Sequence, residues 1–238
     1  LMEHANANDV EGYLPQLAGR PTTDDDGPGS PELYIPRYNY GHKDNKKYLR
    51  GWAINFDTGC AMGPGPGGSM PGFGSAHKKR TKELYPARFT MGGYCEGLAF
   101  DWNYVEIDPG GLRDRWGIPQ VRFHTNAEYP QAFAILNAMY DAIEEIAKAS
   151  GGVLLPYERR APYPLGSVTH EAGGARMGDD PRTSVLDKWN RCHDIKNIRV
   201  VDAACFVSHP EKEITHTIMA LAYRAADHLA EEFRRGQV

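Results

Sequence analysis

The chain has 238 residues, 41% of them hydrophobic, which is enough to bury a core in one large or two small domains. Its 27 basic and 31 acidic residues give a net charge of -4 without long runs of like charge, which disfavours nucleic acid as a partner. No apolar run approaches the roughly 20 residues that span a bilayer, and the first residues lack the features of a secretion signal. The residues indicate no cellular location.

The first residue and the cysteines bear on the context of the chain. Because Leu1 is not a methionine, we expect the chain to be an internal part of something longer. The cysteines show no C-x-x-C spacing, so we expect buried thiols rather than a zinc, haem or dithiol site. They are Cys60, Cys95, Cys192 and Cys205.

Polar and turn-forming residues dominate the first part of the chain. They predict long loops from residue 1 to about 47, with a short strand over 32–35. A second strand is expected over 49–56. The composition of 60–75 then predicts an irregular loop rich in glycine and proline.

This loop contains the spacing G-x-G-x-x-G at Gly63, Gly65 and Gly68. The spacing is a dinucleotide fingerprint only where a strand precedes it and a helix opens within it. Pro64 and Pro66 remove backbone donors that would cradle a pyrophosphate. We therefore interpret these glycines as a coincidental match.

The middle of the chain alternates between apolar and polar residues. This pattern over 88–96, 99–107 and 120–124 predicts an antiparallel sheet, with turns at 108–111 and 116–119.

A helix is expected from about 129 to 149, with Asn126 as its cap and Gly151 as its stop. Its predicted apolar face consists of Phe133, Leu136, Tyr140, Ile143 and Ala147.

The C-terminal region predicts a strand over 198–202 and a final helix over about 214–235, which form an α/β unit. A ligand is expected at the carboxyl end of such a strand. The expected buried face of the helix consists of Ile218, Leu221, Ala222, Ala225, Leu229 and Phe233.

Two segments carry groups capable of chemistry. His170 precedes Gly173 and Gly174, where a planar ligand can approach the backbone, although a lone histidine is more often structural. The segment 208–216 contains two histidines and two glutamates. A metal-dependent hydrolase using His209, Glu211, Glu213 and His216 is an alternative, but the spacing matches no established ligand pattern, and carboxylates near a helix start are expected from its dipole.

Four linked blocks resemble the C-terminal signature of the glucose-methanol-choline (GMC) oxidoreductase family. They are His170 to Pro181, Ser184 to Asp187, Asn197 to Ala203, and Thr217 to Ala222 followed by Arg224 to Asp227. Val105 to Gly117 resembles the substrate-domain strand of the family, and Leu1 to His4 resembles the segment that follows its FAD-binding half. The spelling of 171–178 is similar to bacterial sugar enzymes: gluconate 2-dehydrogenase flavin subunits, glucoside 3-dehydrogenases and pyranose oxidase relatives.

The resemblance implies an α/β fold. The C-terminal part of an FAD-binding Rossmann-like domain, residues 161–238, would join an α+β substrate-binding domain with an antiparallel sheet, residues 1–160. It also implies oxidation of a sugar hydroxyl to a carbonyl, with hydride transfer to the flavin N5. The rest of the FAD-binding domain is expected from another chain or a missing segment, and a small subunit or electron acceptor is a possible partner.

The resemblance also implies roles for single residues. His170 falls on the histidine that takes the hydroxyl proton. Asp202, Ala203 and Thr215 fall where the family binds FAD. Glu213 stands at the second catalytic position, where Asn or His is usual, and His216 or His209 is a candidate for the partner role. If Glu213 instead signals lost activity, the alternative is a non-catalytic carbohydrate-binding or scaffold subunit.

Overall fold

The computed structural model describes residues 1–21, 32–38, 47–58, 70–124, 130–162 and 170–237. The chain forms two compact units. Unit 1 is made of Leu1–His4, Glu96–Tyr129 and Tyr163–Val238, and unit 2 of Ala5–Cys95 and Pro130–Pro162. The predicted loop glycines at 63, 65 and 68, Cys60 and the helix cap Asn126 lie outside the described residues.

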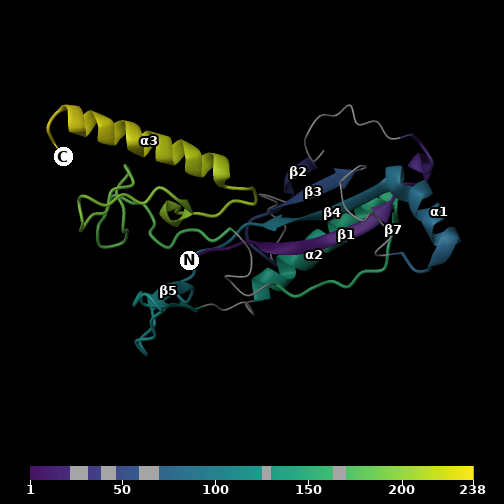
Figure 1. Cartoon of the computed structure of the whole chain (residues 1–238), viewed down its shortest axis with the longest axis horizontal. Coiled ribbons are helices and arrows are strands. Elements are labelled where there is room, and N and C mark those ends of the chain that lie inside the picture. Colours follow the sequence, from purple (N-terminus) through teal and green to yellow (C-terminus); the bar gives the residue numbers. More distant parts are fainter. Residues whose placement is uncertain (22–31, 39–46, 59–69, 125–129, 163–169, 238) are drawn as a thin grey trace. The chain divides into compact units, whose positions relative to one another are not determined.

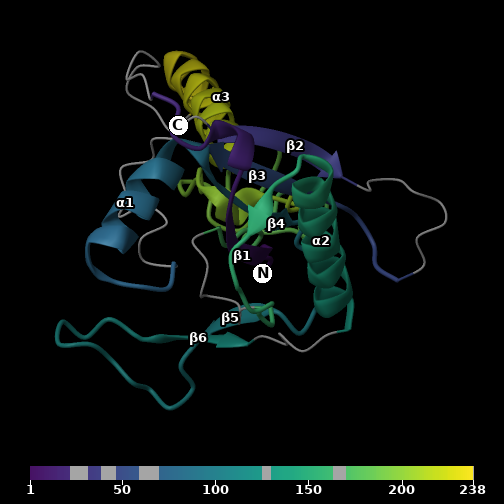
Figure 2. The same ribbon diagram turned by 90° about the vertical axis from the view of Figure 1, so that its right-hand side faces the viewer.

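Unit 2 is a five-stranded antiparallel sheet with the order β2-β3-β4-β1-β7, and the long helix α2 lies along one face of it (Figure 1; Figure 2). The strands are β1 (Ala5–Tyr13), β2 (Glu32–Tyr38), β3 (Trp52–Thr58), β4 (Arg88–Cys95) and β7 (Val153–Leu154). The helices are α1 (Gly74–Leu84) and α2 (Pro130–Ala149), with short 3-10 turns at Pro15–Leu17 and Tyr85–Ala87.

The apolar stripe of α2 explains why this helix covers the sheet. Leu136, Tyr140 and Ile143 are fully buried, as predicted, because their spacing places them on one face. They share one apolar cluster with Trp52 and Phe89 of the sheet. The predicted helix over 129–149 is therefore confirmed, except that Phe133 of its predicted face is exposed.

Unit 1 contains less regular structure. Its elements are the two-stranded antiparallel sheet of β5 (Tyr104–Ile107) and β6 (Val121–His124), a 3-10 turn at Ala203–Cys205 and the helix α3 (Thr215–Arg234). Isolated bridges join the remaining segments. A small apolar cluster around Met2, Ala172 and Leu186 forms the core of this unit. No helix among the described residues is long and apolar enough to cross a bilayer.

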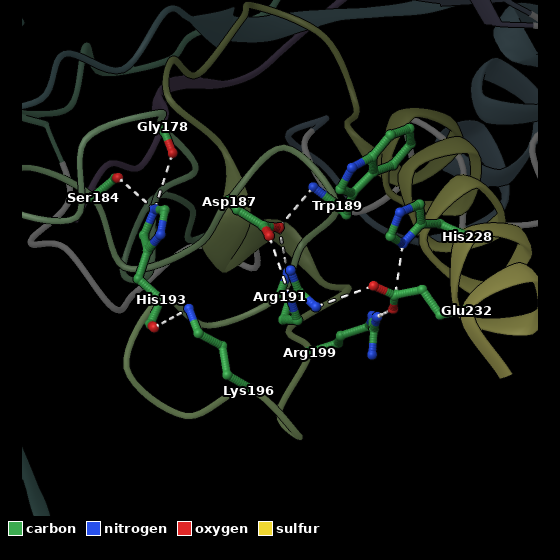
Figure 3. A network of polar contacts seen from close by, with 10 residues as sticks. All are labelled: Gly178, Ser184, Asp187, Trp189, Arg191, His193, Lys196, Arg199, His228 and Glu232. Carbon is green, nitrogen blue, oxygen red and sulfur yellow. Dashed lines mark hydrogen bonds and ion pairs between the residues drawn. The ribbon is translucent and has the colours of Figure 1, made fainter. Parts of the chain in front are cut away.

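A network of ion pairs connects the last turns of α3 to residues 187–199 (Figure 3). Glu232 of α3 accepts hydrogen bonds from Arg199 and from Arg191, the latter at 3.1 Å, and its side chain is only 13% exposed. Arg191 also pairs with Asp187 at 3.4 Å. Shielded pairs resist screening by solvent, so this network orders the chain between residues 187 and 199.

We expect Glu232→Gln to destabilise unit 1 by about 3 kcal/mol, because two arginines lose the charge that compensates them in a shielded place. Denaturant unfolding measures this change. The matched control is Glu231→Gln on the same turn, whose exposed pair with Arg235 contributes little. Equal effects of the two substitutions would contradict the structural role of Glu232.

The structure corrects several predictions for the first half of the chain. Residues 1 to 47 are not only loops, because β1 is a nine-residue strand within the sheet. Its ladder partners lie far away in sequence, so its local composition does not reveal it. Helix α1 was not predicted at all, and it begins inside the expected loop over 60–75. The predicted strands over 32–35 and 49–56 are confirmed as β2 and β3.

The predicted sheet over 88–124 is two separate structures. β4 pairs with β1 and β3 in unit 2, whereas β5 and β6 pair only with each other among the described residues of unit 1. The chain nevertheless has the mixed α/β character, with antiparallel sheets, that its sequence predicts.

The last part of the chain also differs from its prediction. Residues 198–202 form no strand, because their only bridge among the described residues joins Arg199 to Arg191, and one bridge makes no ladder. The expected α/β unit is therefore absent there. The final helix is confirmed as α3, but Leu229 and Phe233 of its predicted buried face are exposed. The division into a substrate-binding domain over 1–160 and an FAD-binding part over 161–238 stays a prediction.

The cysteines agree in part with the expectation of buried thiols. Cys95 and Cys205 are buried and Cys192 is half-buried, and each of these three is a free thiol. Burial raises the pKa of Cys95 and Cys205, so neither thiol is activated.

Candidate functional site

A backbone pairing brings the first residues of the chain against the segment that follows His170. The N–H of Met2 donates to the carbonyl of Ala172 at 2.8 Å, and the N–H of Ala172 donates to the carbonyl of Met2 at 2.9 Å. The side chains of both residues belong to the apolar core of unit 1. This pairing places His4 beside His170.

Three histidine rings meet here. The Nδ1 atoms of His4 and His170 lie 3.1 Å apart, and Nε2 of His4 lies 2.6 Å from the carbonyl oxygen of Pro210. The ring of His209 packs against that of His4 with 3.9 Å between centroids. His4 and His209 are only 3% and 2% exposed, whereas His170 is half-buried.

Burial controls the protonation of two of these rings. It is the main cause that lowers the pKa of His4 to about 2, and the neighbouring His209 and His170 lower it further, against the opposing effect of the Pro210 carbonyl. Burial also lowers the pKa of His209 to about 4. Both rings are therefore neutral at physiological pH.

Gly97 allows the close packing of this histidine cluster. Its N–H donates to the carbonyl of His209 at 3.2 Å. A Cβ atom at this position would lie 2.7 Å from the carbonyl oxygen of Glu3 and 3.0 Å from Nδ1 of His209, so no larger residue fits without movement. This role depends on contacts with Glu3 and His209, which are distant in sequence, so no local pattern around Gly97 indicates it.

The residues that directly follow His170 in the sequence line a pocket of about 350 Å³. Its walls come from the start of the chain, the signature segment after His170, the 3-10 turn and the first turn of α3. They are Leu1, Glu171, Ala172, Gly174, Asp202, Ala203, Ala204 and Ile218. The pocket thus joins the predicted cofactor residues Asp202 and Ala203 to the segment that carries His170.

The lining of the pocket fits the edge of a flat ring system. Six of its eight residues are apolar, and four of these are alanine or glycine. A Cβ atom on Gly174 would meet nothing within 4 Å, so the backbone there is open to approach. The first helical hydrogen bond of α3 runs from the N–H of Ile218 to the carbonyl of Ile214. The N–H groups of the residues before Ile218 therefore form the positive end of the helix dipole. The volume lies at the low end of the roughly 300–1,000 Å³ typical of ligand sites, which suits a ring but not a whole dinucleotide.

The remaining predicted site residues lie around the start of α3. Thr215 is its first residue and is exposed, as is His216. Glu213 is also exposed and forms an ion pair with Lys212 at 3.6 Å. The pocket lining includes none of these three, whose roles stay predictions.

The cluster that suggested a metal-dependent hydrolase does not assemble into a ligand set. Among the described residues, no group of three or more His, Cys, Asp or Glu side chains is arranged to hold a metal ion. His209 is buried against His4, whereas His216 lies exposed on α3. This alternative therefore gains no support from the structure.

Sequence reasoning missed His4 as a member of the site. It appeared only as the end of the Leu1 to His4 segment, and 166 residues separate it from His170. No spacing pattern reveals a contact over such a distance. His209 was considered as a partner for His170, and the structure places its ring in the same cluster.

Comparison with known proteins places the chain in a family of oxidoreductases. The family model described as GMC oxidoreductase matches residues 100–222, which is more than half of the chain. The chain therefore belongs to the GMC oxidoreductase family.

Individual relatives differ in what they act on. The chain is 32% identical to 2-methyl-1,2-propanediol dehydrogenase of Mycolicibacterium austroafricanum, over 82% of this chain and 36% of that protein. It is 24% identical to the gluconate 2-dehydrogenase flavoprotein of Pantoea cypripedii, over 71% of this chain and 28% of that protein. The chain thus spans about a third of the length of these relatives. A solved structure of pyridoxine 4-oxidase matches 96% of this chain and 44% of its own with a TM-score of 0.44 and 16% identity.

Proposed function

We propose that this chain is part of an FAD-dependent oxidoreductase that converts a hydroxyl of a sugar or glycoside to a carbonyl. One observation carries this assignment: the three residues Glu171, Ala172 and Gly174, which follow His170, line the same pocket as Asp202 and Ala203. The family places its proton-accepting histidine and its flavin contacts in these two segments. The proposed base is thus adjacent in the sequence to residues that line a pocket large enough for a ring.

The residues of the chain divide the work as follows. His170 takes the proton of the substrate hydroxyl, a contribution of roughly 10² to 10⁴ in rate. Asp202, Ala203 and the start of α3 at Thr215 would hold the flavin, and the dipole of α3 would favour negative charge there. When bound, FAD supplies the acceptor for the hydride that leaves the substrate carbon.

A sugar is the proposed substrate class for two reasons. The signature segment 171–178 resembles bacterial sugar enzymes, and a relative named gluconate 2-dehydrogenase flavoprotein matches 71% of the chain. The exposed Glu213 and His216 are proposed to line the substrate side, where carboxylate and imidazole groups can hydrogen-bond to sugar hydroxyls. The diol dehydrogenase relative makes a small aliphatic alcohol the competing substrate class.

The partners follow from the small share of each relative that the chain covers. We propose that the remaining FAD contacts come from a preceding segment or a second chain. A small subunit or an electron carrier would then reoxidise the flavin.

Anaerobic titration of the flavin-loaded protein, including its FAD-binding part, tests the function. We expect methyl glucoside or glucose to bleach the flavin absorbance. Bleaching by 1,2-propanediol but not by any sugar would contradict the sugar assignment while keeping alcohol oxidation. Absence of bound flavin would contradict the whole proposal.

A further inference from the structure

The contact between His4 and Pro210 fixes where His4 carries its proton. A backbone carbonyl can only accept a hydrogen bond, and proline has no N–H. Nε2 of His4 lies 2.6 Å from the carbonyl oxygen of Pro210, so this nitrogen is the donor. His4 therefore has its proton on Nε2.

The other nitrogen of His4 must then be an acceptor. Burial to 3% exposure keeps the ring neutral, and a neutral imidazole carries one proton only. Since that proton is on Nε2, Nδ1 of His4 presents a lone pair.

His170 faces this lone pair with its own Nδ1, 3.1 Å away. Two lone pairs at this distance would repel each other, so Nδ1 of His170 carries a hydrogen and donates it to His4. The rings stand edge-on at 85°, which allows the N–H in the plane of one ring to point along the in-plane lone pair of the other. Neutral His170 is consequently left with an unprotonated Nε2.

This tautomer is the opposite of the one that a free histidine side chain prefers. A free neutral imidazole side chain carries its proton mainly on Nε2, and a protonated Nε2 cannot take the substrate proton. In proteins the hydrogen bond made by one ring nitrogen decides the state of the other. The chain from the Pro210 carbonyl through His4 to His170 thus leaves Nε2 of His170 as the basic atom.

His4 is itself held firmly enough for this task. The paired hydrogen bonds between Met2 and Ala172 anchor the backbone two residues away, and the ring of His209 packs on one side of it. With Nε2 bonded to Pro210 and Nδ1 facing His170, His4 cannot offer a nitrogen to a substrate.

We propose that His4 is a positioning residue, which holds His170 in the tautomer that is protonated on Nδ1 and unprotonated on Nε2, the atom that takes the substrate proton. This role rests on the proposed function of His170 as the base. Nothing in it requires His4 to touch the substrate or the flavin.

Nitrogen-15 NMR of the histidine-labelled protein tests the tautomer directly, with the His170→Ala variant used to assign the signals. We expect a protonated Nδ1 and an unprotonated Nε2 for His170 in the neutral form. A protonated Nε2 would overturn the positioning role even if the protein oxidises sugars. The expected tautomer in a protein that oxidises nothing would uphold it and contradict only the proposed function.

Two substitutions of His4 separate positioning from simple packing. His4→Leu fills the space without an acceptor, so we expect the His170 proton to move to Nε2 and kcat to fall roughly 10- to 100-fold, with KM little changed. His4→Asn keeps an oxygen acceptor at the same number of bonds from Cβ as Nδ1. It should keep the proton on Nδ1 of His170 and recover most of kcat. If the asparagine variant loses as much activity as the leucine variant, the positioning role is wrong.

Discussion

Replacing His170 with alanine is expected to lower kcat for hydroxyl oxidation by about 10² to 10⁴-fold, the contribution typical of a general base. The binding of substrate should change little, because Glu213 and His216, the groups proposed to line the substrate side, remain in place. The rate of flavin reduction in anaerobic stopped-flow measurements reports the loss.

The matched control is His77→Ala, a half-buried histidine on α1 in the other unit, which should leave the rate unchanged. A rate for the His170 variant within about threefold of the unsubstituted protein would remove this residue from the chemistry. If the unsubstituted protein binds sugar but turns nothing over, the alternative of a binding or scaffold subunit replaces the enzyme assignment.

Acidification is expected to unfold unit 1 because two of its histidines are buried in the neutral form. The folded-state pKa values of His4 and His209, about 2 and about 4, lie below the ordinary histidine value near 6.5. Below pH 6.5 these two histidines therefore bind protons in the unfolded chain but not in the folded chain, so the free energy of unfolding decreases as pH falls. Each pH unit costs about 1.4 kcal/mol per histidine, continuing to about pH 4 for His209 and about pH 2 for His4.

This loss is large relative to the roughly 5–15 kcal/mol that stabilises a typical domain. The groups facing His4 include the rings of His170 and His209 and the carbonyl of Pro210. Hydrogen exchange resolved by peptide, measured between pH 7 and 4.5, should show unit 1 opening before unit 2, whose described core cluster contains no histidine.

His209→Phe keeps a flat ring against His4 but cannot titrate, so it should reduce the pH dependence of unit 1 by about half. Unchanged pH dependence in this variant would mean that the buried histidines do not control acid stability. Simultaneous opening of both units would show instead that the acid response is global.

The sequence predicts those features that depend on local pattern. The 3.6-residue spacing of Leu136, Tyr140 and Ile143 predicts α2 and its buried face, because a helix brings residues four apart onto one side whatever it packs against. The signature after His170 likewise identifies the family and the segment that lines the pocket.

The failed predictions share one physical cause. β1 and the contact between His4 and His170 depend on partners far along the chain, and the burial of Leu229 and Phe233 was inferred from spacing without knowledge of what covers α3. A periodic pattern indicates that a face is apolar but does not supply the partner that buries it. Residues 198–202 are apolar enough for a strand, yet a strand needs a ladder.

The sequence by itself thus determined the family, the helices with strong periodicity and the identity of His170 as the candidate base. Only the tertiary structure indicates which nitrogen of neutral His170 carries the proton. That choice depends on the carbonyl of Pro210 and on His4, which three separate parts of the chain bring together. Hydrogen-bond geometry and burial select the tautomer of a histidine, and the spacing of residues along the chain predicts neither of them.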